Sequence, residues 1–482
     1  MKPPFSIKHG ILWLILLVVL TGFLLIFSFN TSPLFPYDYG VDSGFYRYMG
    51  SIILKGKTPY TDLWEHKGPI LYFIQALGAI HGTRNEKLSF IFLMQIFSLC
   101  LSAFFLRKAD ELISNGKGSF LRFLLLMFCA LSVLGTTLDG GNLTEEWSIP
   151  MICCSFYLFT KYAIKSGSNV RHSRMYAFIH GICFGLIAFI RINNSISICA
   201  GLLVIGIYLI IKRQWKNLFE NIIFGILGIL TVVIPVFAFF YKRNALYEML
   251  YGTFIFNLKY TDITDVVFSA SAWFYQMTPL VLSAALILLS LLQTRQMRLI
   301  DVIVFTITSM NLVMLTKINR YIHYYIICFP VLLYTLILYI KPKKYFSILL
   351  TLVLFSFYFT NSKNLAAYYL RPDHMPLFST ANLYFPKSER DSTIAVDVPS
   401  EIYLNLGITP CSRFAAFQTR IFKLNPEFEK EFIQTMQEKD PKWIITPCSY
   451  DGIVPYVREL VNNQYSYQFN DGPYCFFRQT EQ

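Results

Sequence analysis

The residues best suited to chemistry lie in a polar stretch that follows the first apolar segment of the chain. This stretch reads DSGFYRYMGSIILKGKTPYTDLWEHKGP and begins at Asp42. It presents the carboxylate of Asp42 at one end and Glu65, His66 and Lys67 at the other, with Tyr60 shortly before them. A carboxylate within hydrogen-bond reach of a hydroxyl group can act as its general base, and a lysine can neutralise a phosphate. We therefore expect this stretch to act on substrates that bring a hydroxyl group and a phosphate.

A second set of acids and bases lies at the ends of later apolar segments. The stretch TLDGGNLTEEWSIP, from position 137, brings Asp139, Glu145 and Glu146. The other candidates lie at the ends of the fifth and tenth apolar segments, and they are Arg191, Asn194, Arg320 and His323. Arginine can bind phosphate through two parallel hydrogen bonds, so both arginines are candidate phosphate ligands.

The composition places these residues in a membrane protein. The chain has 482 residues, of which 55% are hydrophobic and only 15% charged, and its mean hydropathy is +0.47. Soluble domains usually carry about 25% charged residues. The net charge of +13 is spread singly and in short clusters between apolar segments, which argues against nucleic-acid binding.

About 20 apolar residues are needed to cross the hydrocarbon core of a bilayer. About eleven segments approach that length and are predicted to span the membrane: 11–29, 88–106, 119–136, 147–164, 176–190, 195–211, 218–241, 272–293, 299–316, 322–340 and 345–361. The first is too long for a signal-peptide core and lacks a following small-residue cleavage site, so we expect it to be retained.

The loops between these segments alternate in charge, which predicts their orientation by the positive-inside rule. Short basic clusters mark the predicted cytoplasmic loops: Arg107-Lys108, Lys165 with Arg171 and Arg174, Lys212-Arg213 with Lys216, Arg295 with Arg298, and Lys341 with Lys343-Lys344. The opposite loops are acidic: Asp38, Asp42, Asp62, Glu65, Asp139, Glu145, Glu146, Glu248, Asp262 and Asp265. An odd number of spans then places residues 362–482 outside the cytoplasm of a multi-pass plasma-membrane protein.

The fold class predicted is therefore an all-α polytopic membrane domain with a small extracytoplasmic α/β domain. We expect the first to cover residues 1–361, with its first external loop at 31–87, and the second to cover 362–482. In the second we expect strands at 393–398 and 443–446, a helix at 427–438 and a closing hairpin at 465–478. Three cysteines of this region, Cys411, Cys448 and Cys475, allow one disulfide and have no metal-site spacing.

In the first external loop, residues 45–54 have an amphipathic pattern, which predicts a helix lying in the membrane interface. Trp64 and the neighbouring tyrosines suit the level of the lipid headgroups. We therefore expect Asp42 and the Glu65-His66-Lys67 segment to lie close to the membrane surface.

The order of these motifs resembles a known family. The features that carry this similarity are, in order, an external Asp near the first span, GKTPYTD…HKGP, NLTEEW, RINN and RYIHYY. Through them the chain is similar to bacterial GT-C glycosyltransferases related to protein mannosyltransferases and the lipid A aminoarabinose transferase. The resemblance implies that Asp42 is the catalytic carboxylate, that Glu145 is the second-loop acid, and that Lys67 contacts a lipid phosphate. The family often has two adjacent acids in the first loop, whereas Ser43 follows Asp42 here. A divalent metal, present in some relatives, therefore stays an open question, with Glu65, His66 or His323 as candidate ligands.

These observations favour inverting transfer of a sugar from a polyprenyl phosphate to an envelope glycan, lipid or protein on the extracytoplasmic face. Asp42 would take the proton of the acceptor hydroxyl, while Lys67, Arg191 and Arg320 hold the departing phosphate. We expect His66 and Tyr60 to contribute to substrate binding. The polyprenyl tail would stay in the bilayer, which explains a site at the interface.

Each candidate also has a structural alternative. Asp42 could cap the helix that follows it. Lys67 could extend to lipid headgroups, and Glu145 and Glu146 suit the first turn of any helix. His323 could satisfy a neighbouring carbonyl.

Arg191, Asn193 and Asn194 could form an ordinary polar helix end. Asp38 would replace Asp42 if that residue were not the base, whereas Asp62 and Asp139 are expected to be solvated or structural.

Two other functions remain open. A transporter or lipid flippase would need ionisable residues near the bilayer midplane or broken helices, and the middle of each predicted span is nearly free of charge. A non-catalytic partner in envelope assembly would keep the same hydropathy as an enzyme.

Overall fold

The computed structural model describes residues 7–35, 40–83, 88–116, 118–167, 170–260, 270–294, 296–317, 321–340, 378–449 and 454–480. The chain divides into two compact units, each made of three segments. The helical unit comprises Met1–Phe29, Phe92–Phe239 and Thr264–Arg371, and the loop-and-sheet unit comprises Asn30–Ile91, Phe240–Ile263 and Pro372–Gln482. The predicted boundary between residues 361 and 362 lies outside the described residues.

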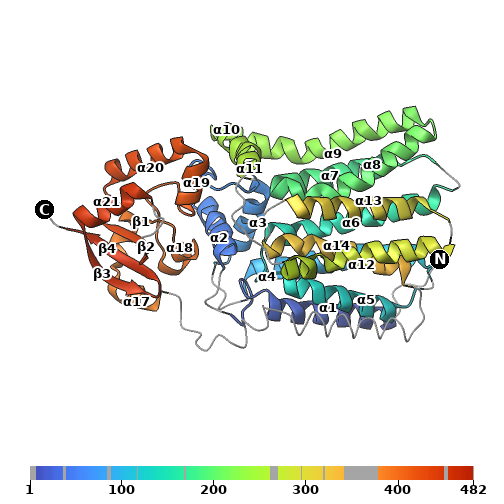
Figure 1. Ribbon diagram of the computed structural model, residues 1–482, viewed down its shortest axis with the longest axis horizontal. Coiled ribbons are helices and arrows are strands. Elements are labelled where there is room, and N and C mark those ends of the chain that lie inside the picture. Colours follow the sequence, from blue (N-terminus) through green and yellow to red (C-terminus); the bar gives the residue numbers. More distant parts are fainter. Residues whose placement is uncertain are drawn as a thin grey trace. The chain divides into compact units, whose positions relative to one another are not determined.

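The helical unit consists of long apolar helices (Figure 1). In chain order these elements are α1 (Ile7–Phe27), α4 (Phe90–Ile113), α5 (Phe120–Thr137), α6 (Thr144–Lys165), α7 (Arg174–Arg191), the 3-10 helix η1 (Ile192–Ser195), α8 (Ile196–Ile211), α9 (Trp215–Tyr241), α12 (Ala270–Thr294), α13 (Leu299–Lys317), the 3-10 helix η3 (Ile322–Ile327) and α14 (Cys328–Tyr339). Among the described residues, eight helical runs are long and apolar enough to cross a membrane, and one of these covers both α7 and α8. The predicted polytopic helical fold is thus confirmed. The predicted span at 147–164 forms the helix α6 but is not among the eight runs, and the predicted span at 345–361 lies outside the described part of the chain.

One helix continues past its predicted membrane span. The predicted span at 88–106 stops before Arg107, because charged residues are costly in a membrane. The helix continues to Ile113, because both oxygens of the Asp110 carboxylate are paired, one with Arg107 and the other with Arg122 at 2.5 Å. Arg122 also donates to the carbonyl oxygens of Ile337 and Ile340, at 2.9 and 2.7 Å. Charges neutralised by one another in this way can extend a helix beyond its apolar segment.

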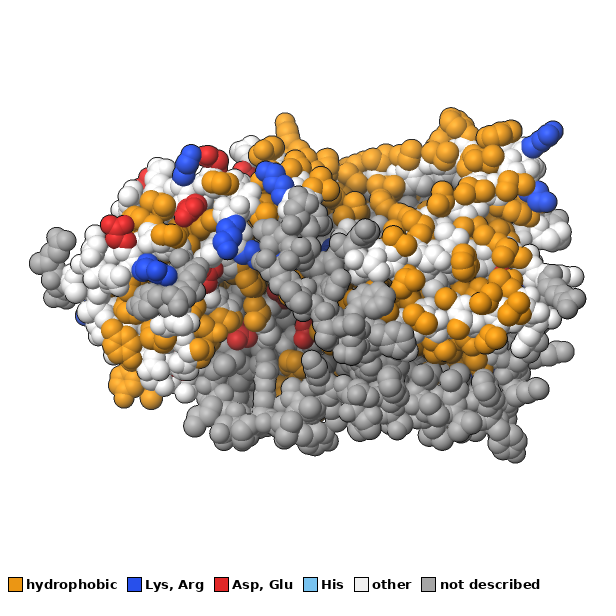
Figure 2. Space-filling view, in the orientation of Figure 1, with side chains coloured by type: hydrophobic (Ala, Val, Ile, Leu, Met, Phe, Trp, Pro, Cys, Tyr) orange, Lys and Arg blue, Asp and Glu red, His pale blue; other side chains and the backbone are white. Residues whose placement is uncertain are grey.

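Large apolar side chains cover the outside of the helical unit, as expected where lipid replaces water. Val18 of α1, Ile211 of α8 and Phe219 of α9 are more than 60% exposed, and Figure 2 shows apolar side chains spread over this unit on the face drawn. Close packing inside the unit depends on glycine. A Cβ at Gly181 or Gly228 would lie 2.1 Å from a carbonyl oxygen of a neighbouring helix, so α7 and α9 approach through small residues, as membrane helices commonly do.

The loop-and-sheet unit combines short helices with one sheet. Its helices before the sheet are α2 (Val41–Leu54), α3 (Pro69–Ala79), α10 (Leu246–Leu250), the π-helix η2 (Tyr251–Ile255) and α11 (Phe256–Tyr260). The C-terminal region contains α17 (Ser379–Tyr384), the 3-10 helix η4 (Lys387–Ser392), β1 (Thr393–Ala395), α18 (Glu401–Leu406), α19 (Gln418–Leu424), α20 (Pro426–Lys439), β2 (Trp443–Pro447), α21 (Pro455–Gln464), β3 (Tyr465–Asp471) and β4 (Tyr474–Gln479).

The strands, helix and hairpin predicted for the C-terminal region are present, although β1 ends at Ala395 and not at residue 398. The strand order of the sheet is β1-β2-β4-β3, with β1 parallel to β2 and the other pairs antiparallel. The predicted helix at 427–438 corresponds to α20, whose Phe428, Phe432 and Met436 are buried at the spacing of one helix face. Their side chains belong to the core that α20 shares with the sheet.

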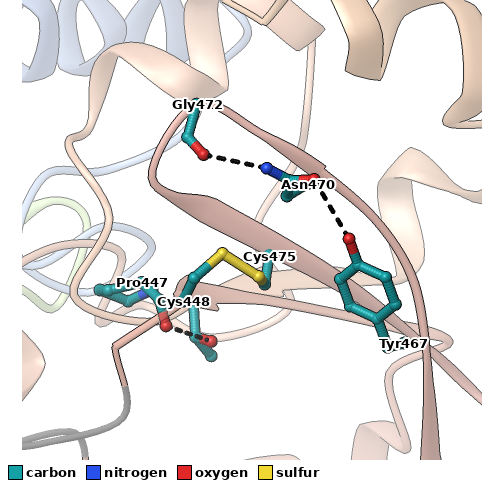
Figure 3. Close-up of a disulfide and its surroundings, with 7 residues drawn as sticks. Pro447, Cys448, Tyr467, Asn470, Gly472 and Cys475 are labelled. Atoms are coloured by element: carbon teal, nitrogen blue, oxygen red, sulfur yellow. Dashed lines mark hydrogen bonds between the residues drawn. A yellow bond between two sulfur atoms is a disulfide. The ribbon is translucent and has the colours of Figure 1, made fainter.

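One disulfide forms among the three cysteines of this region. Cys448, just after β2, is bonded to Cys475 in β4 (Figure 3). Cys411 is a free cysteine. The bond ties the segment after β2 to the closing hairpin, whose turn is held by hydrogen bonds from Tyr467 to Asn470 and from Asn470 to Gly472.

Candidate functional site

The first loop (residues 31–87) folds into two packed helices, α2 and α3, with a compact turn between them. A Cβ at Gly50 of α2 would lie 2.4 Å from the backbone of Gln75 in α3, so the two helices are in close contact. The turn is held by Asp62, which accepts a hydrogen bond from the backbone N–H of Thr58 at 2.7 Å. Pro69 begins α3, where its missing N–H would be unpaired in any case. Lys67 therefore lies just before a helix start, at a fixed point of the backbone.

Glu65, His66 and Lys67 form one hydrogen-bonded network. The Glu65 carboxylate lies 2.9 Å from His66 Nδ1 and 3.6 Å from Lys67 Nζ, and Lys67 Nζ lies 2.8 Å from His66 Nε2. Because an ammonium group can only donate, Nε2 is the acceptor and the ring proton lies on Nδ1, where it is donated to Glu65. All three side chains are about one-tenth exposed, which leaves the network accessible at one side.

The Glu65 carboxylate is held in its ionised form. Burial would raise the pKa of Glu65, but Lys67 and the hydrogen bonds from His66 and Tyr72 lower it well below its usual range. Tyr72 donates to Glu65 Oε2 at 2.5 Å, and the backbone N–H of Lys67 donates to the same oxygen at 2.8 Å. Burial, together with the charge of Glu65, raises the pKa of Tyr72 well above its usual value, so the phenol keeps the proton that it donates.

Tyr60 supports this network from behind. Its side chain is completely buried, and its hydroxyl donates to the carbonyl oxygen of Lys67 at 2.7 Å and lies 3.1 Å from Thr253 Oγ1. Asn257 donates to the carbonyl oxygen of His66 at 2.6 Å. The backbone on both sides of the His66–Lys67 peptide bond is therefore fixed by side chains from elsewhere in the same unit.

Asp42 lies in the first turn of α2 and is partly exposed. The residue at the N-cap is Gly40, with φ of 63°, and a Cβ there would lie 2.4 Å from Asn30 Oδ1. No hydrogen bond or ion pair joins the Asp42 carboxylate to another described residue, so the capping bond considered above is not seen. The carboxylate is thus available to a ligand.

In the helical unit, a helix-end cluster gathers polar residues from the ends of several helices. It contains Ser28, Gln95, Asp139, Asn142, Glu145, Glu146, Arg191, Asn194, His323 and Tyr324. All of these come from helix ends that the charge pattern assigns to the extracytoplasmic side. The structure therefore brings together helix ends that the charge pattern predicts to lie on one side of the membrane.

Glu145 and Arg191 form the central ion pair of the helix-end cluster. Arg191 donates to Glu145 Oε1 at 2.6 Å, and Thr144 donates to the other carboxylate oxygen at 2.8 Å. The Arg191 guanidinium also lies over the ring of Tyr324, 3.9 Å from its centroid, where a cation is attracted to the aromatic face. Nearby, Asn194 donates to Ser148 Oγ at 3.0 Å.

Glu146 has neutral partners instead of a cation. Gln95 donates to both of its oxygens, at 2.9 and 3.1 Å, and the backbone N–H of Asn142 donates at 2.6 Å. The indole of Trp147 fixes the Asn142 side chain at 3.0 Å. These bonds satisfy a carboxylate that is only 5% exposed.

Asp139 and His323 form a further pair, with Oδ2 and Nδ1 3.1 Å apart. The sequence favoured a solvated or structural Asp139, and the carboxylate is in fact half exposed and paired with the His323 ring. Asp139 begins a strained segment, because all four residues from 139 to 142 have positive φ, between 49° and 83°. Such backbone persists only where surrounding contacts impose it, and it is common at functional sites.

The structure thus gathers the candidates into two sets. The loop-and-sheet unit holds Tyr60, His66 and Lys67 together and Asp42 at the start of α2. The helical unit holds Glu145, Glu146, Arg191, Asn194 and His323. Asp38 and Arg320 lie outside the described residues.

Several partners of these candidates were not predicted. Tyr72, Asn257, Gln95, Asn142 and Tyr324 contact candidate residues directly. Three of them lie in or beside motifs that were singled out, but Gln95 and Asn257 lie inside apolar stretches, where an isolated amide is the only available signal.

The candidate metal ligands do not form a donor set. Glu65 and His66 bind each other, and His323 binds Asp139 in the other unit. Among the described residues, no group of three or more His, Cys, Asp or Glu side chains is arranged to hold a metal ion.

Comparison with known proteins connects this arrangement to a family and a fold. Residues 6–363 match the family model of the competence-induced protein Ccs4 N-terminal domain. No curated protein has a sequence that matches the chain.

Among solved structures, the chain is similar to ArnT from Cupriavidus metallidurans, both bound to undecaprenyl phosphate and in the apo state. Both comparisons give a TM-score of 0.62 at 12% identity, and they cover 96% and 98% of this chain and 97% and 98% of ArnT. The apo oligosaccharyltransferase of Archaeoglobus fulgidus matches with a TM-score of 0.49 at 11% identity, over 90% of this chain and 69% of that one. ArnT is a GT-C glycosyltransferase, so the predicted GT-C fold is confirmed.

Proposed function

Because the chain belongs to the family of the competence-induced protein Ccs4 N-terminal domain and has the GT-C fold, we propose that it is a membrane glycosyltransferase with a polyprenyl-phosphate sugar as donor. The acceptor is an envelope glycan, lipid or protein. The observation that carries the proposal is the Glu65–His66–Lys67 network, which holds a lysine ammonium at a partly open position just before α3. ArnT, which shares the fold, is bound to undecaprenyl phosphate in one of its structures.

In this proposal the departing phosphate is neutralised by Lys67. Hydrogen bonds from Tyr60 and to Glu65 fix the backbone of Lys67. The neighbours of its ammonium group are His66 and Glu65, and both side chains can stay in place when a phosphate oxygen approaches. A phosphate is a good leaving group, so the reaction needs cations more than a general acid. Tyr60 is completely buried and would position Lys67 without touching the sugar.

Asp42 is proposed as the general base. It accepts the proton of the acceptor hydroxyl while the hydroxyl oxygen attacks the anomeric carbon from the face opposite the phosphate. The bond between that carbon and the phosphate oxygen breaks, and the electron pair leaves with the polyprenyl phosphate. The configuration at the anomeric carbon is inverted. The position of Asp42, with no partner among the described residues, supports this role.

The helix-end cluster is proposed to bind the polar part of a substrate. Arg191 is fixed by Glu145 and Tyr324 and would offer a positive charge to an anionic group of that substrate. Arg320 would add another.

The reaction is proposed to take place on the extracytoplasmic face of the plasma membrane. The charge alternation of the loops supports this side. The disulfide between Cys448 and Cys475 supports it as well, because structural disulfides form mainly outside the reducing cytoplasm.

Binding of the donor tests Lys67 directly. Undecaprenyl phosphate titrated into the purified full-length protein in detergent should bind wild type about tenfold more tightly than Lys67→Met, because a charge-assisted contact to phosphate is lost. Lys57→Met is the matched control, since Lys57 lies in the same loop and pairs with Asp62 at 3.6 Å while more than half exposed. Equal affinity of the Lys67→Met variant and wild type would refute the phosphate contact.

Transfer is tested in the source cell, because the sugar and the acceptor are then both present. Deleting the gene should remove one envelope glycan modification detectable by mass spectrometry, and wild type should restore it. Asp42→Asn should fail to restore it, whereas Asp62→Asn, which changes an exposed carboxylate of the same loop, should succeed. Restoration by Asp42→Asn would exclude Asp42 as the base, and an unchanged glycan profile after deletion would contradict transfer altogether.

A further inference from the structure

We propose that the C-terminal region is part of the framework of the catalytic site, because Trp64 and Arg413 lock the first loop to it and so position Lys67. This inference rests on the proposed function of Lys67 as the phosphate contact. It gives the C-terminal region a role in the donor site, where sequence patterns showed only a small α/β domain.

Trp64, the residue before Glu65, is part of the hydrophobic core of the C-terminal region. Its side chain is 2% exposed, and its ring lies 5.1 Å from Phe428 and 6.2 Å from Phe414, centroid to centroid. Phe256 of α11 packs against it at 4.7 Å. The prediction that Trp64 lies among lipid headgroups is therefore wrong, because a protein core of aromatic rings takes up the indole instead.

Arg413 forms hydrogen bonds with Tyr60 and Trp64, at the two ends of the segment 60–64 of the first loop. Its guanidinium donates to the carbonyl oxygen of Tyr60 at 2.9 Å, and its own carbonyl oxygen accepts from the backbone N–H of Trp64 at 2.8 Å. The first contact leads on to Lys67, because the Tyr60 hydroxyl donates to the Lys67 carbonyl oxygen. The Arg413 side chain is thus linked to the Lys67 backbone through two hydrogen bonds, both of which involve Tyr60.

The Arg413 side chain is itself held in one orientation. Glu431 of α20 pairs with it through both carboxylate oxygens, at 2.6 and 2.7 Å, and Glu248 lies 3.3 Å away. The guanidinium also lies over the rings of Phe414 and Phe428, at 4.9 and 5.3 Å. A planar, bidentate and stacked arrangement of this kind is one that lysine does not reproduce.

The helix that carries Asp42 is attached to the C-terminal region as well. Tyr48 of α2 donates to the carbonyl oxygen of Ile408 at 3.1 Å, and its ring stacks on Tyr403 of α18 at 5.3 Å. Both ends of the catalytic part of the first loop therefore depend on the same region. This explains why the first loop and the C-terminal region belong to one compact unit.

The test compares Arg413→Met with Arg413→Lys in the purified full-length protein. We expect Arg413→Met to bind undecaprenyl phosphate about tenfold more weakly, because a misplaced cation loses much of its interaction with phosphate. Arg413→Lys should recover part of that loss, since one donor to Tyr60 or Glu431 remains. Hydrogen–deuterium exchange should accelerate in residues 60–67 of Arg413→Met, while exchange in β2 and β4 stays as in wild type.

Lys430→Met is the matched control, because Lys430 lies on α20 beside Glu431 and forms only an exposed pair with Glu427. It should leave both affinity and exchange unchanged. Trp64→Phe provides a second variant in case Arg413→Met does not fold, and it should accelerate exchange in residues 64–67.

The outcomes separate the inference from the function on which it rests. Accelerated exchange confined to residues 393–480, with unchanged affinity for undecaprenyl phosphate, would overturn the positioning role and leave Arg413 as a structural residue. If Lys67→Met also bound undecaprenyl phosphate normally, the proposed donor contact would fail, while the exchange data would still decide whether Arg413 positions the loop.

Discussion

The two ends of the helical unit both hold buried charges, but they arrange them differently. At one end, Asp110 of α4 is shared by Arg107 and Arg122, and Arg122 also binds two carbonyl oxygens of the last described turn of α14. At the other end, Glu145 has Arg191 and Asp139 has His323. Four successive residues of that second end have positive φ, whereas the turn after α4 has two, at Asn115 and Gly116.

This difference separates a structural cluster from a candidate site. The Asp110 group ties α4, α5 and α14 together through one shared acid, so its bonds stabilise the helix packing. Among the described residues, Glu145 and Asp139 of the helix-end cluster each pair with one basic residue and Glu146 with none. The cluster also lies beside strained backbone, which is maintained at a cost in stability. We therefore expect mutations at the two ends to affect different measurements.

Arg122→Met should have the largest effect on stability. It leaves Asp110 with one cation and two carbonyl groups without their donor, and removing one partner of a buried ion pair costs about 3–4 kcal/mol. Denaturant unfolding in detergent measures this loss, and transfer per folded molecule should stay normal. A stable but inactive Arg122→Met would contradict the distinction between the two ends.

Arg191→Met should mainly reduce transfer. We expect about a hundredfold lower turnover, or about 2.7 kcal/mol, because a fixed cation of the helix-end cluster is lost from substrate binding. The same assay on Arg191→Lys should show an intermediate value, since a lysine keeps the charge but not the bidentate geometry. Turnover equal to wild type would assign Arg191 to folding alone.

Gly141→Ala, compared with Gly116→Ala, tests whether the segment 139–142 is held by its surroundings. Gly141 has φ of 78°, and a Cβ there would lie 2.2 Å from Ser28 Oγ, whereas Gly116 has φ of 76° and open space around a Cβ. Both substitutions should cost about 1 kcal/mol for the left-handed backbone. Gly141→Ala should cost about 1–2 kcal/mol more for overpacking. Equal unfolding free energies for the two variants would show that the segment can relax.

The effect of Glu65→Gln on stability depends on pH. The pKa of Glu65 in the folded protein is below the unfolded value of about 4.3. The ionised carboxylate therefore contributes its full stabilisation above about pH 4.3, and this is lost as pH falls through the lower folded-state pKa. The stability difference between wild type and Glu65→Gln should shrink over that range. Glu427→Gln, at an exposed pair, should show no such trend.

Much of the fold was predictable because it depends on local patterns. The predicted span at 218–241 is α9 (Trp215–Tyr241), and the predicted strand at 443–446 is β2 (Trp443–Pro447). Apolar runs and alternating residues are visible along the chain without knowledge of distant contacts. The continuation of α4 to Ile113 was not predictable in this way, since Asp110 meets Arg122 only after the helices pack.

The sequence predicted which residues belong to the candidate site, but it did not predict which residues they contact. Lys67, Glu145 and Arg191 were identified because they are charged residues in loops and span ends that the positive-inside rule assigns to one side of the membrane. Tyr72 and Tyr324, which contact Lys67 and Arg191, were not identified, because an uncharged side chain gives no sign of its partner until folding brings the two together.

The sequence by itself determined that the chain spans a membrane, which loops carry charge, and which residues could act on a phosphate, because these properties follow from the order of apolar and polar residues. Only the tertiary structure decided which acid meets which cation, and that Trp64 is buried in the C-terminal region rather than among lipids. Pairings of this kind join residues far apart in the chain, so they depend on packing geometry that no local pattern contains.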